Sequence, residues 1–223
     1  MRETIKHIPI LGSLIGRLYG ALGRRIRPFP GSATYWNRRY DGGGNSGPGS
    51  YRELAEFKAG ILNAFVAEKE VSSVIEYGSG DGNQLKLATY PSYVGFDVSP
   101  TAIARCEACF RGDETKRFAL IQDYHGETAQ LTLSLDVIYH LTEDDVYHSH
   151  MATLFESSTQ FVVIYSSNYD APQASHEKRR KFTPWVEAHA SAWKLIQHIP
   201  HRHEFQGDSE EGSLSDFFVY EKL

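Results

Sequence analysis

Three glycines at alternate positions follow a short apolar run, and this pattern constrains the fold more than any other feature of the sequence. Residues 74–83 read VIEYGSGDGN. The apolar, β-branched start of this segment predicts a buried parallel strand. Glycine has no Cβ and tolerates positive φ, so such a turn lets backbone N–H groups approach a bound molecule closely. We therefore expect a ligand site at the carboxyl end of this strand.

A second strand pattern carries a carboxylate at a matching position. Residues 93–98 read YVGFDV, and Asp97 lies 17 residues after Gly80. In α/β sheets, ligands bind outside the carboxyl ends of the strands, and an acidic residue at about this distance contacts ribose hydroxyls. The two features together disfavour a glycine-rich turn without function.

The glycine spacing separates two classes of nucleotide-binding protein. Dinucleotide-binding folds use G-x-G-x-x-G, but here the third glycine comes one position early. The pattern Glu76-x-Gly78-x-Gly80-x-Gly82 resembles the first motif of class I S-adenosylmethionine-dependent methyltransferases. The resemblance implies that the glycine backbone surrounds the amino-acid end of the cofactor, that Glu76 reaches its ammonium group through water, and that Asp97 binds its ribose.

The rest of the chain alternates between strand and helix patterns. We expect strands near residues 73–77, 93–98, 118–122, 131–136, 161–166, 193–199 and 217–221. Seven strands with five helical links predict an α/β fold with a doubly wound, mostly parallel sheet. The last two strands have no helix between them, so they should form a hairpin with an antiparallel last strand. This order also resembles the class I methyltransferase fold.

Three predicted helices begin with a capping pattern. The patterns are Ser50 with Glu53 before a helix over residues 51–68, Ser99 with Pro100 after the second strand, and Thr142 with Asp145 after the fourth.

Charge divides the chain into an arm and a domain. Residues 1–27 hold six basic residues against Glu3, a charge of +5, which leaves −10 for the rest because the net charge is −5. We predict a basic amphipathic N-terminal arm over residues 1–30 and a methyltransferase domain over residues 31–223. Peripheral membrane contact through residues 1–27, packing or oligomer contact, and disorder all stay open for the arm. An acidic body does not suggest a nucleic-acid groove.

The segment between the arm and the first long helix contains a glycine-rich loop, residues 41–50, DGGGNSGPGS. It is either a linker or a loop that folds over the cofactor, with Asn45 and Ser46 meeting an anionic group. In the resembling family, an N-terminal Tyr-Trp helix lies near the cofactor. The resemblance therefore makes Tyr35 and Trp36 cofactor candidates and Arg39 a substrate candidate.

Residues after the third and fourth strands are candidates for adenine binding and for catalysis. The resemblance makes Asp123 an acceptor for the adenine amino group and Tyr124 a ring-stacking neighbour, unless Asp123 only starts a turn. It also places Asp136, Tyr139 and His140 beside the sulfonium methyl group. An imidazole is a suitable general base for a hydroxyl acceptor, and Asp136 could orient it or hold the cofactor. A buried or capping His140 is the alternative.

Four consecutive basic residues follow the fifth strand, in the segment HEKRRKF over residues 176–182. They suggest recognition of a carboxylate or phosphate on the substrate, with His176, Arg179 and Arg180 as candidates. A solvated basic face is the alternative.

Metal and redox interpretations are weaker. Cys106 and Cys109 share one face of a predicted helix, which favours packing over a thiol site. Asp136 with the acids of residues 143–145 permits Mg²⁺, but acids at a helix start are favoured by the macrodipole without metal. Three histidines near the final hairpin lack a recognisable spacing, so we predict no metal. They are His198, His201 and His203.

The sequence thus predicts an S-adenosylmethionine-dependent enzyme that methylates a hydroxyl of a small or glycan acceptor carrying an anionic group. A catalytically silent cofactor-binding or scaffold protein and a nucleotide-dependent oxidoreductase are the alternatives. The scarce cysteines and the lack of a signal peptide or membrane-spanning run predict a cytoplasmic location. Membrane association through the arm stays open, as does oligomer formation.

Overall fold

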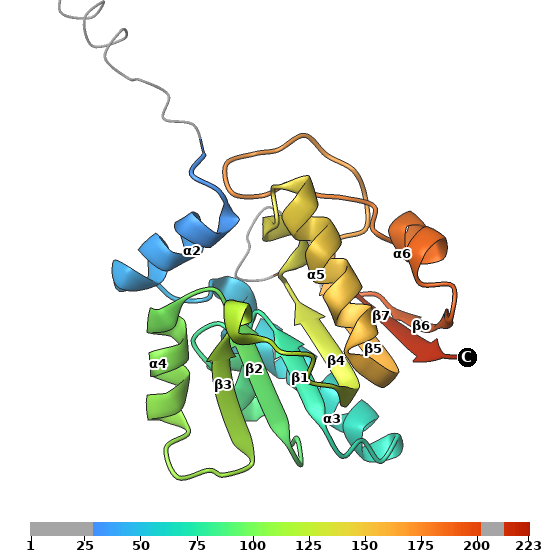
Figure 1. The fold of residues 1–223 in the computed structure, drawn as a ribbon, viewed down its shortest axis with the longest axis horizontal. Coiled ribbons are helices and arrows are strands. Elements are labelled where there is room, and N and C mark those ends of the chain that lie inside the picture. The colour runs from blue at the N-terminus through green and yellow to red at the C-terminus, as the bar shows by residue number, and fades with distance from the viewer. Residues whose placement is uncertain (1–28, 202–211) are drawn as a thin grey trace, which may run out of the picture. The chain divides into compact units, whose positions relative to one another are not determined.

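A seven-stranded sheet organises the chain from residue 74 onward (Figure 1). The computed structural model describes residues 29–201 and 212–223, so the predicted arm and His203 lie outside the described residues, apart from positions 29 and 30. The strand order is β3-β2-β1-β4-β5-β7-β6. The strands are β1 (Val74–Tyr77), β2 (Tyr93–Asp97), β3 (Lys116–Leu120), β4 (Ala129–Leu135), β5 (Ser158–Ser166), β6 (Trp193–Ile199) and β7 (Asp216–Lys222).

The strand directions match the predicted fold. Strands β1 to β5 pair in parallel, while β7 pairs antiparallel with both β5 and β6. The final hairpin therefore inserts its last strand between β5 and β6. The predicted doubly wound, mostly parallel sheet with an antiparallel last strand is confirmed.

The helical links differ in part from the prediction. The described α-helices are α2 (Ser32–Asp41), α3 (Arg52–Glu68), α4 (Pro100–Cys109), α5 (Asp144–Glu156) and α6 (Thr183–His189). Two of the five predicted links contain only a short 3₁₀ helix, η2 (Gln84–Leu87) after β1 and η3 (Ile121–Asp123) after β3. The expectation of five helical links was wrong at both. After β3, residues 121–128 are too few for a crossover helix.

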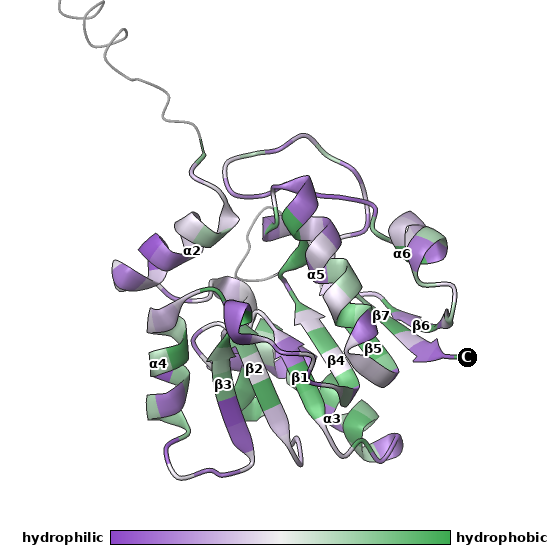
Figure 2. Cartoon of the chain, in the orientation of Figure 1, coloured by the Kyte–Doolittle hydropathy of each residue, from purple (hydrophilic) through white to green (hydrophobic). Residues whose placement is uncertain are grey.

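Residues alternate along the strands between two hydrophobic layers. On β5, Phe161, Val163 and Tyr165 join the core under α3, whereas Val162 and Ile164 join the core under α5 and α6. Figure 2 shows hydrophobic residues along β1, β2 and β4, and hydrophilic residues at the start of β3. Burial on both faces explains why the central strands read as continuous apolar runs.

One of the three capping predictions is confirmed. Ser99 accepts a hydrogen bond from the N–H of Ala102 at the start of α4. The capping box at Ser50 is wrong, since Ser50 ends a 3₁₀ turn, η1 (Pro48–Ser50), and Tyr51 precedes α3 without a side-chain cap. The cap at Thr142 is also wrong, because its hydroxyl donates to Glu143, which itself occupies the N-cap position of α5.

The cysteine prediction holds for one residue of the pair. Cys106 is buried in α4 and its Sγ lies 3.2 Å from the carbonyl oxygen of Gly80. Cys109 is exposed, which corrects the expectation that both thiols pack. Cys109 is the last residue of α4, whose buried residues are Ala102, Ile103 and Cys106.

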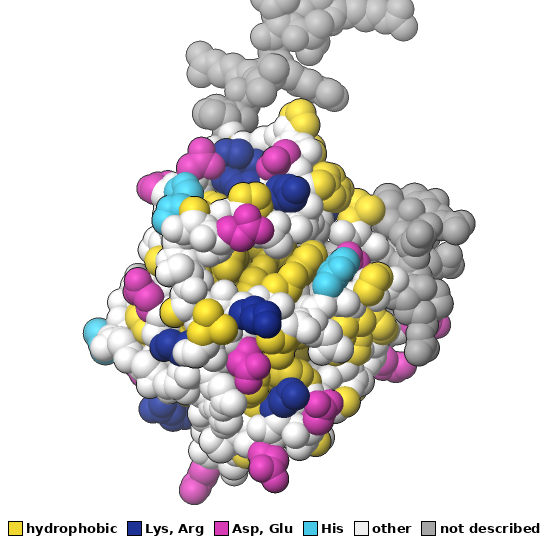
Figure 3. Space-filling view, turned by 90° about the vertical axis from the view of Figure 1, so that its right-hand side faces the viewer, with side chains coloured by type: hydrophobic (Ala, Val, Ile, Leu, Met, Phe, Trp, Pro, Cys, Tyr) yellow, Lys and Arg dark blue, Asp and Glu magenta, His cyan; other side chains and the backbone are white. Residues whose placement is uncertain are grey.

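Strand β6 forms one edge of the sheet and faces solvent along most of its length. Leu195 and Ile196 are exposed at its centre, beside Lys194. Figure 3 views the molecule from the side that faces right in Figure 1, and shows hydrophobic side chains interspersed with charged ones. Charged residues on an edge strand oppose edge-to-edge pairing.

Among the described residues, no helix combines the length and the apolar character needed to cross a membrane.

Two leucines allow a matched test of the core. Leu133 on β4 is fully buried, whereas Leu195 on β6 is 42% exposed. We expect Leu133→Ala to lower the free energy of unfolding by about 2–5 kcal/mol, because it leaves a cavity between sheet and helix. Leu195→Ala should cost under about 1 kcal/mol. Urea unfolding of both variants measures this, and equal losses would contradict the arrangement of the core.

Candidate active site

A cavity of about 480 Å³ lies at the carboxyl ends of β1, β2 and β4. This volume falls in the range of about 300–1,000 Å³ typical of small-molecule sites. Eight of the predicted site residues line it: Trp36, Ser46, Glu76, Gly78, Gly80, Asp97, Asp136 and His140. The other ten do not: Tyr35, Arg39, Asn45, Gly82, Asp123, Tyr124, Tyr139, His176, Arg179 and Arg180.

The glycine-rich turn after β1 needs its glycines for conformation and for space. Gly78 and Gly80 have φ of 92° and 60°. A Cβ at Gly78 would lie 2.4 Å from Val137 Cγ2, which no real contact allows. The N–H groups of Gly78 and Ser79 both donate to the carbonyl oxygen of Phe96. These bonds attach the turn to the end of β2.

Asp97 holds the turn and also faces the cavity. Its Oδ2 accepts from Gly80 N at 3.0 Å and its Oδ1 accepts from Ser99 N at 2.9 Å. Burial raises the pKa of Asp97, and backbone donors at Ser99, Gly80 and Val98 oppose that rise. The two carboxylate oxygens have four lone pairs in total, so at least one acceptor position remains for a ligand hydroxyl.

Glu76 is a buried acid at the base of the cavity. Its Oε2 accepts from the Tyr93 hydroxyl at 2.7 Å, and it is 5% exposed. Burial raises its pKa from 4.5 to about 7, although Tyr93 and the Lys58 charge oppose the rise. A cationic ligand group beside Glu76 would favour its ionised form.

Ser79 carries the next polar group of the turn. Ser79 is part of the cavity lining, but its Oγ is buried and has no hydrogen-bond partner among the described residues. A buried hydroxyl without a partner costs free energy. Ser79 was not among the predicted site residues, because a serine between two glycines carries no sequence signal of its own.

The ion pair between Lys58 and Asp136 was also missed. Lys58 on α3 is 1% exposed and donates to Asp136 Oδ2 at 2.8 Å. Asp136 Oδ1 accepts from the hydroxyls of Tyr139 and Ser215, each at 3.1 Å. A lysine on the apolar face of a predicted helix, between Leu54 and Leu62, is the sequence signal that could have identified Lys58.

These contacts change the predicted role of Asp136. Within the described ranges no hydrogen bond joins Asp136 to His140, and the partners of its carboxylate are Lys58, Tyr139 and Ser215. The structure therefore does not show Asp136 orienting His140. Tyr139 supports Asp136 from outside the cavity lining.

The glycine-rich loop folds onto the turn after β1. Ser46 N donates to Asp81 Oδ2 at 3.0 Å, and Asp81 N donates to Ser46 Oγ at 2.9 Å. The hydroxyl of Tyr51 also donates to Asp81, at 2.7 Å. The loop is therefore fixed against the cavity rather than being a free linker. Arg39 and Asn45 bond to one another beside the loop instead of facing the cavity.

Trp36 and His140 line the cavity, and the rings of Tyr35 and His176 pack beside them. Trp36 meets His140 edge to face at 4.9 Å, and Tyr35 stacks on His176 at 4.4 Å. The rings of His140 and His176 are nearly parallel, 5.1 Å apart. Burial lowers the pKa of His140 to about 3. Because a general base works best with a pKa near the working pH, His140 alone is a weak candidate for that role.

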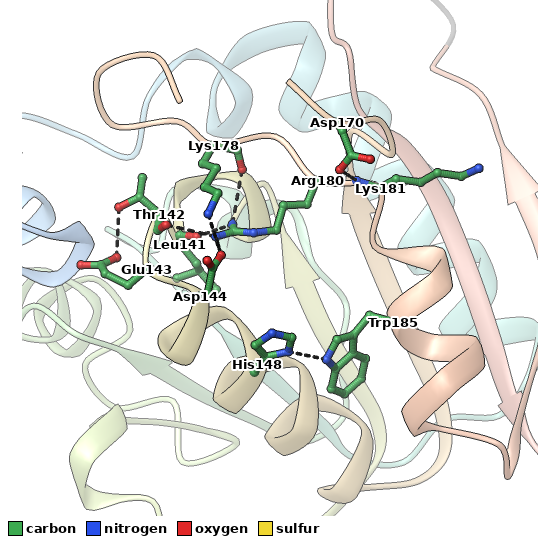
Figure 4. A network of polar contacts seen from close by, with 10 residues as sticks. All are labelled: Leu141, Thr142, Glu143, Asp144, His148, Asp170, Lys178, Arg180, Lys181 and Trp185. Atoms are coloured by element: carbon green, nitrogen blue, oxygen red, sulfur yellow. Dashed lines mark hydrogen bonds and ion pairs between the residues drawn. The ribbon is translucent and has the colours of Figure 1, made fainter. Parts of the chain in front are cut away.

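The basic stretch has partners within the protein (Figure 4). Arg180 donates to the carbonyl oxygens of Leu141 and Thr142 and to Asp144 Oδ1, the last at 2.7 Å. Lys178 also pairs with Asp144. Lys178 and Arg180 together lower the pKa of Asp144 to about 2.

Arg179 is likewise engaged, because it donates to Glu177 Oε2 at 2.8 Å. Arg179 and Arg180 therefore fix the loop after β5 against its neighbours and are not directed at the cavity. The prediction that they recognise a substrate anion has no support in this geometry.

The predicted adenine residues lie away from the cavity. Asp123 is exposed in η3. Tyr124 packs edge to face against Tyr77 and Phe96, and its hydroxyl donates to a backbone carbonyl. Ile121 lines the cavity instead, and an apolar residue in a loop gives no sequence signal for such a position.

Comparison with known proteins places the fold in one class. No family model and no curated protein sequence matches the chain. Among solved structures, the N-methyltransferase NodS from Bradyrhizobium japonicum WM9, with S-adenosyl-L-homocysteine, aligns over 86% of this chain and 98% of its own, at 15% identity and TM-score 0.63.

Two further structures agree. The methyltransferase domain of bacterial CtHen1-C covers 76% of this chain and 99% of its own, at 18% identity and TM-score 0.59. Magnesium protoporphyrin IX methyltransferase (ChlM) from Synechocystis PCC 6803, with S-adenosyl-L-homocysteine, covers 95% of both chains at 10% identity and TM-score 0.57. The chain has the Rossmann-like fold of the class I methyltransferases, as the resemblance implied.

Glu76 makes the stability of the protein depend on pH. Its folded pKa of about 7 lies above the ordinary 4.5, so the folded state binds the proton more tightly. The contribution of Glu76 to the free energy of unfolding is fully present below pH 4.5 and is lost as pH rises through 7. The free energy changes by about 3 kcal/mol over this range. Burial lowers the pKa of His140 and His150, which makes stability rise with pH up to about 6.5 in any variant that keeps them. The contribution of Glu76 is therefore measured as a difference: between pH 5 and 8 the urea midpoint of the unaltered protein should fall relative to that of Glu76→Gln.

The exposed Glu187 supplies the control for this measurement. Glu187→Gln should keep the slope of the unaltered protein, because its carboxylate stays in water in both states. An unchanged slope in Glu76→Gln would show that another group causes the pH dependence.

Proposed function

We propose that this protein is an S-adenosylmethionine-dependent methyltransferase that acts on a hydroxyl of a small acceptor. The observation that carries the proposal is one cavity that joins Glu76, the glycine turn and Asp97 to Asp136 and His140. The fold is consistent with it, since NodS and ChlM, which share this fold, were crystallised with S-adenosylhomocysteine.

The residues around the turn fit the cofactor chemically. Glu76 would hold the ammonium group, because an adjacent cation stabilises its buried carboxylate. The backbone of the turn at Gly78, Ser79 and Gly80 would surround the amino-acid end, and Asp97 would accept from a ribose hydroxyl. When bound, S-adenosylmethionine supplies an electrophilic methyl group at this site.

The adenine ring would lie against an apolar part of the lining in place of the predicted Asp123. Val98, Ile121, Leu141 and Val146 form this part, at the ends of β2 and β3 and the start of α5. Their side chains suit the faces of a purine, and Asp145 beside them offers an acceptor for its amino group.

The acceptor would enter at the end lined by Trp36, Asp136 and His140. Burial keeps His140 neutral at neutral pH, so its ring nitrogen can accept a hydrogen bond from a hydroxyl and fix its direction. The Asp136 carboxylate is held by Lys58, and both side chains line the cavity. We assign to these residues the positioning of the acceptor, which can supply a large part of the rate of a group transfer.

The acceptor class stays a prediction. A sugar or another small hydroxyl compound suits an aromatic wall at Trp36 with a carboxylate and an imidazole nearby. The anionic group predicted for it loses its main support, because Arg179 and Arg180 are paired within the protein.

Titration calorimetry tests the cofactor assignment. We expect micromolar binding of S-adenosylhomocysteine, reduced at least about tenfold in Asp97→Asn, because hydrogen bonds to a charged group contribute about 1.5–3 kcal/mol. Asp170→Asn changes an exposed aspartate whose hydrogen bond among the described residues comes from a backbone N–H, and it should leave the affinity unchanged. Tight binding of NAD without S-adenosylhomocysteine would favour an oxidoreductase.

A methyl-transfer screen with hydroxyl acceptors tests the role of His140. His140→Ala should lower turnover about 100-fold through lost positioning, while the Kd of the cofactor stays within about twofold. His198→Ala, which removes an exposed histidine on β6, is the matched control. Cofactor binding without turnover on any acceptor would support the binding-only alternative.

A further inference from the structure

Two imidazoles and a carboxylate meet at the rim of the cavity. One donor atom each of His140, His176 and Glu177 lie within 4.8 Å of one another, and all three side chains are half-buried. In the described part of the chain, this is the one group of histidine, cysteine and acidic residues with such spacing. His140 is also part of the cavity lining.

The backbone holds these residues in place without a ligand. Ala174 and Glu177 exchange two backbone hydrogen bonds, of 2.8 and 3.0 Å, around Ser175, which has a φ of 56°. A serine in this conformation is strained, and such strain persists where the surroundings enforce it. Lys178 N then donates to the carbonyl oxygen of Tyr139 at 2.8 Å. This bond attaches the loop after β5, which carries His176 and Glu177, to the turn that carries His140.

The surrounding contacts are those that orient metal ligands. His140 Nδ1 lies 3.4 Å from the carbonyl oxygen of His176, which leaves Nε2 of His140 free to bind. Arg179 donates to Oε2 of Glu177, which leaves Oε1 as the donor atom. Ligating histidines commonly bond through their second nitrogen to a carbonyl, and ligating carboxylates are themselves hydrogen-bonded.

We propose that His140, His176 and Glu177 bind a divalent transition-metal ion such as Zn²⁺ at the acceptor end of the cavity. Two imidazoles with one carboxylate form a donor set that suits first-row transition metals better than Mg²⁺, which prefers oxygen ligands. Three protein ligands leave a coordination position open, as in catalytic rather than structural zinc sites.

The role of the ion rests on the proposed function, whereas its binding does not. The open position would take the acceptor hydroxyl in place of a direct hydrogen bond to His140. Coordination makes a bound hydroxyl lose its proton to solvent more readily, so the oxygen becomes a better nucleophile. This differs from the magnesium arrangement considered for Asp136 and residues 143–145, because Asp136 pairs with Lys58 and Asp144 with Lys178 and Arg180.

Cobalt titration of the full chain, stripped of metal with a chelator, tests the proposal. We expect a single equivalent of Co²⁺ with a visible absorption band, displaced by Zn²⁺. His176→Gln and Glu177→Gln should each weaken binding at least about 100-fold. Arg179→Met, which removes the hydrogen bond to Glu177 and the contacts with the rings of Tyr139 and Tyr169, should weaken it about 10–100-fold. His198→Gln is the matched control and should bind as the unaltered protein does.

S-adenosylhomocysteine titrations on the same samples separate the outcomes. Cofactor binding retained in the variants would show that they fold. If His176→Gln does not fold, the cobalt affinities of Glu177→Gln and Arg179→Met test the metal site in its place. Absence of the cobalt band, or equal affinity in the site variants and His198→Gln, would overturn the metal site and leave the proposed function intact. Cobalt binding without cofactor binding would overturn the proposed function and leave the metal site intact.

Discussion

The hydrogen bond from Gly80 N to the Asp97 carboxylate connects the parts of this molecule that form its cavity. It closes a turn that can run only with positive φ, and it joins the carboxyl end of β1 to that of β2. Asp81, one residue further, then bonds to Ser46 and Tyr51 and so attaches the glycine-rich loop and the start of α3. One local backbone conformation thereby positions segments that are about 35 residues apart.

Burying Lys58 imposes a second constraint. An ammonium group taken out of water costs several kcal/mol unless it is well paired. Here Asp136 accepts from it at 2.8 Å and the Tyr165 ring lies 5.3 Å away. Asp136 has a φ of 58°, an unfavourable conformation for a residue with a side chain. The ion pair, with the hydroxyls of Tyr139 and Ser215, holds it there, and η4 (Ile138–His140) starts from that fixed point.

The sequence predicted most of the sheet because its signals are local. Apolar runs, the glycine spacing and the position of Asp97 identified β1, β2 and the turn between them, and the absence of a helical pattern near residues 200–216 identified the final hairpin. Cap assignment at Ser50 and Thr142 failed because Pro48 starts a 3₁₀ turn and because Glu143 occupies the N-cap position before α5. Both outcomes depend on backbone geometry that a capping motif does not encode.

Site residues that directly follow a strand could be predicted from the sequence. Contacts between residues of two different loops could not. Glu76, Gly78, Gly80 and Asp97 follow from strand ends, whereas the meeting of His140 with His176 depends on how the loop after β5 folds back. That fold is set by Arg180, whose guanidinium satisfies backbone carbonyls before α5. The charge run suggested an anion site in the sequence, but its charges are used to build the loop. The hydrogen bonds and ion pairs of these basic side chains cannot be predicted from composition, because they depend on where the acceptor groups lie in the fold.

The short connection between β3 and β4 forms part of the cavity wall. Residues 121–128 contain only η3, so no α-helix connects β3 to β4. Ile121 of this connection lines the cavity together with side chains of α5, among them Ser149, His150 and Thr153, and with Tyr77 and Phe96. His150 is held by Ser134 at 2.9 Å, and burial lowers its pKa to about 4, so it stays neutral at neutral pH. A neutral, partly apolar wall of this kind suits an uncharged ring better than an anion, which agrees with the pairing of the nearby arginines within the protein.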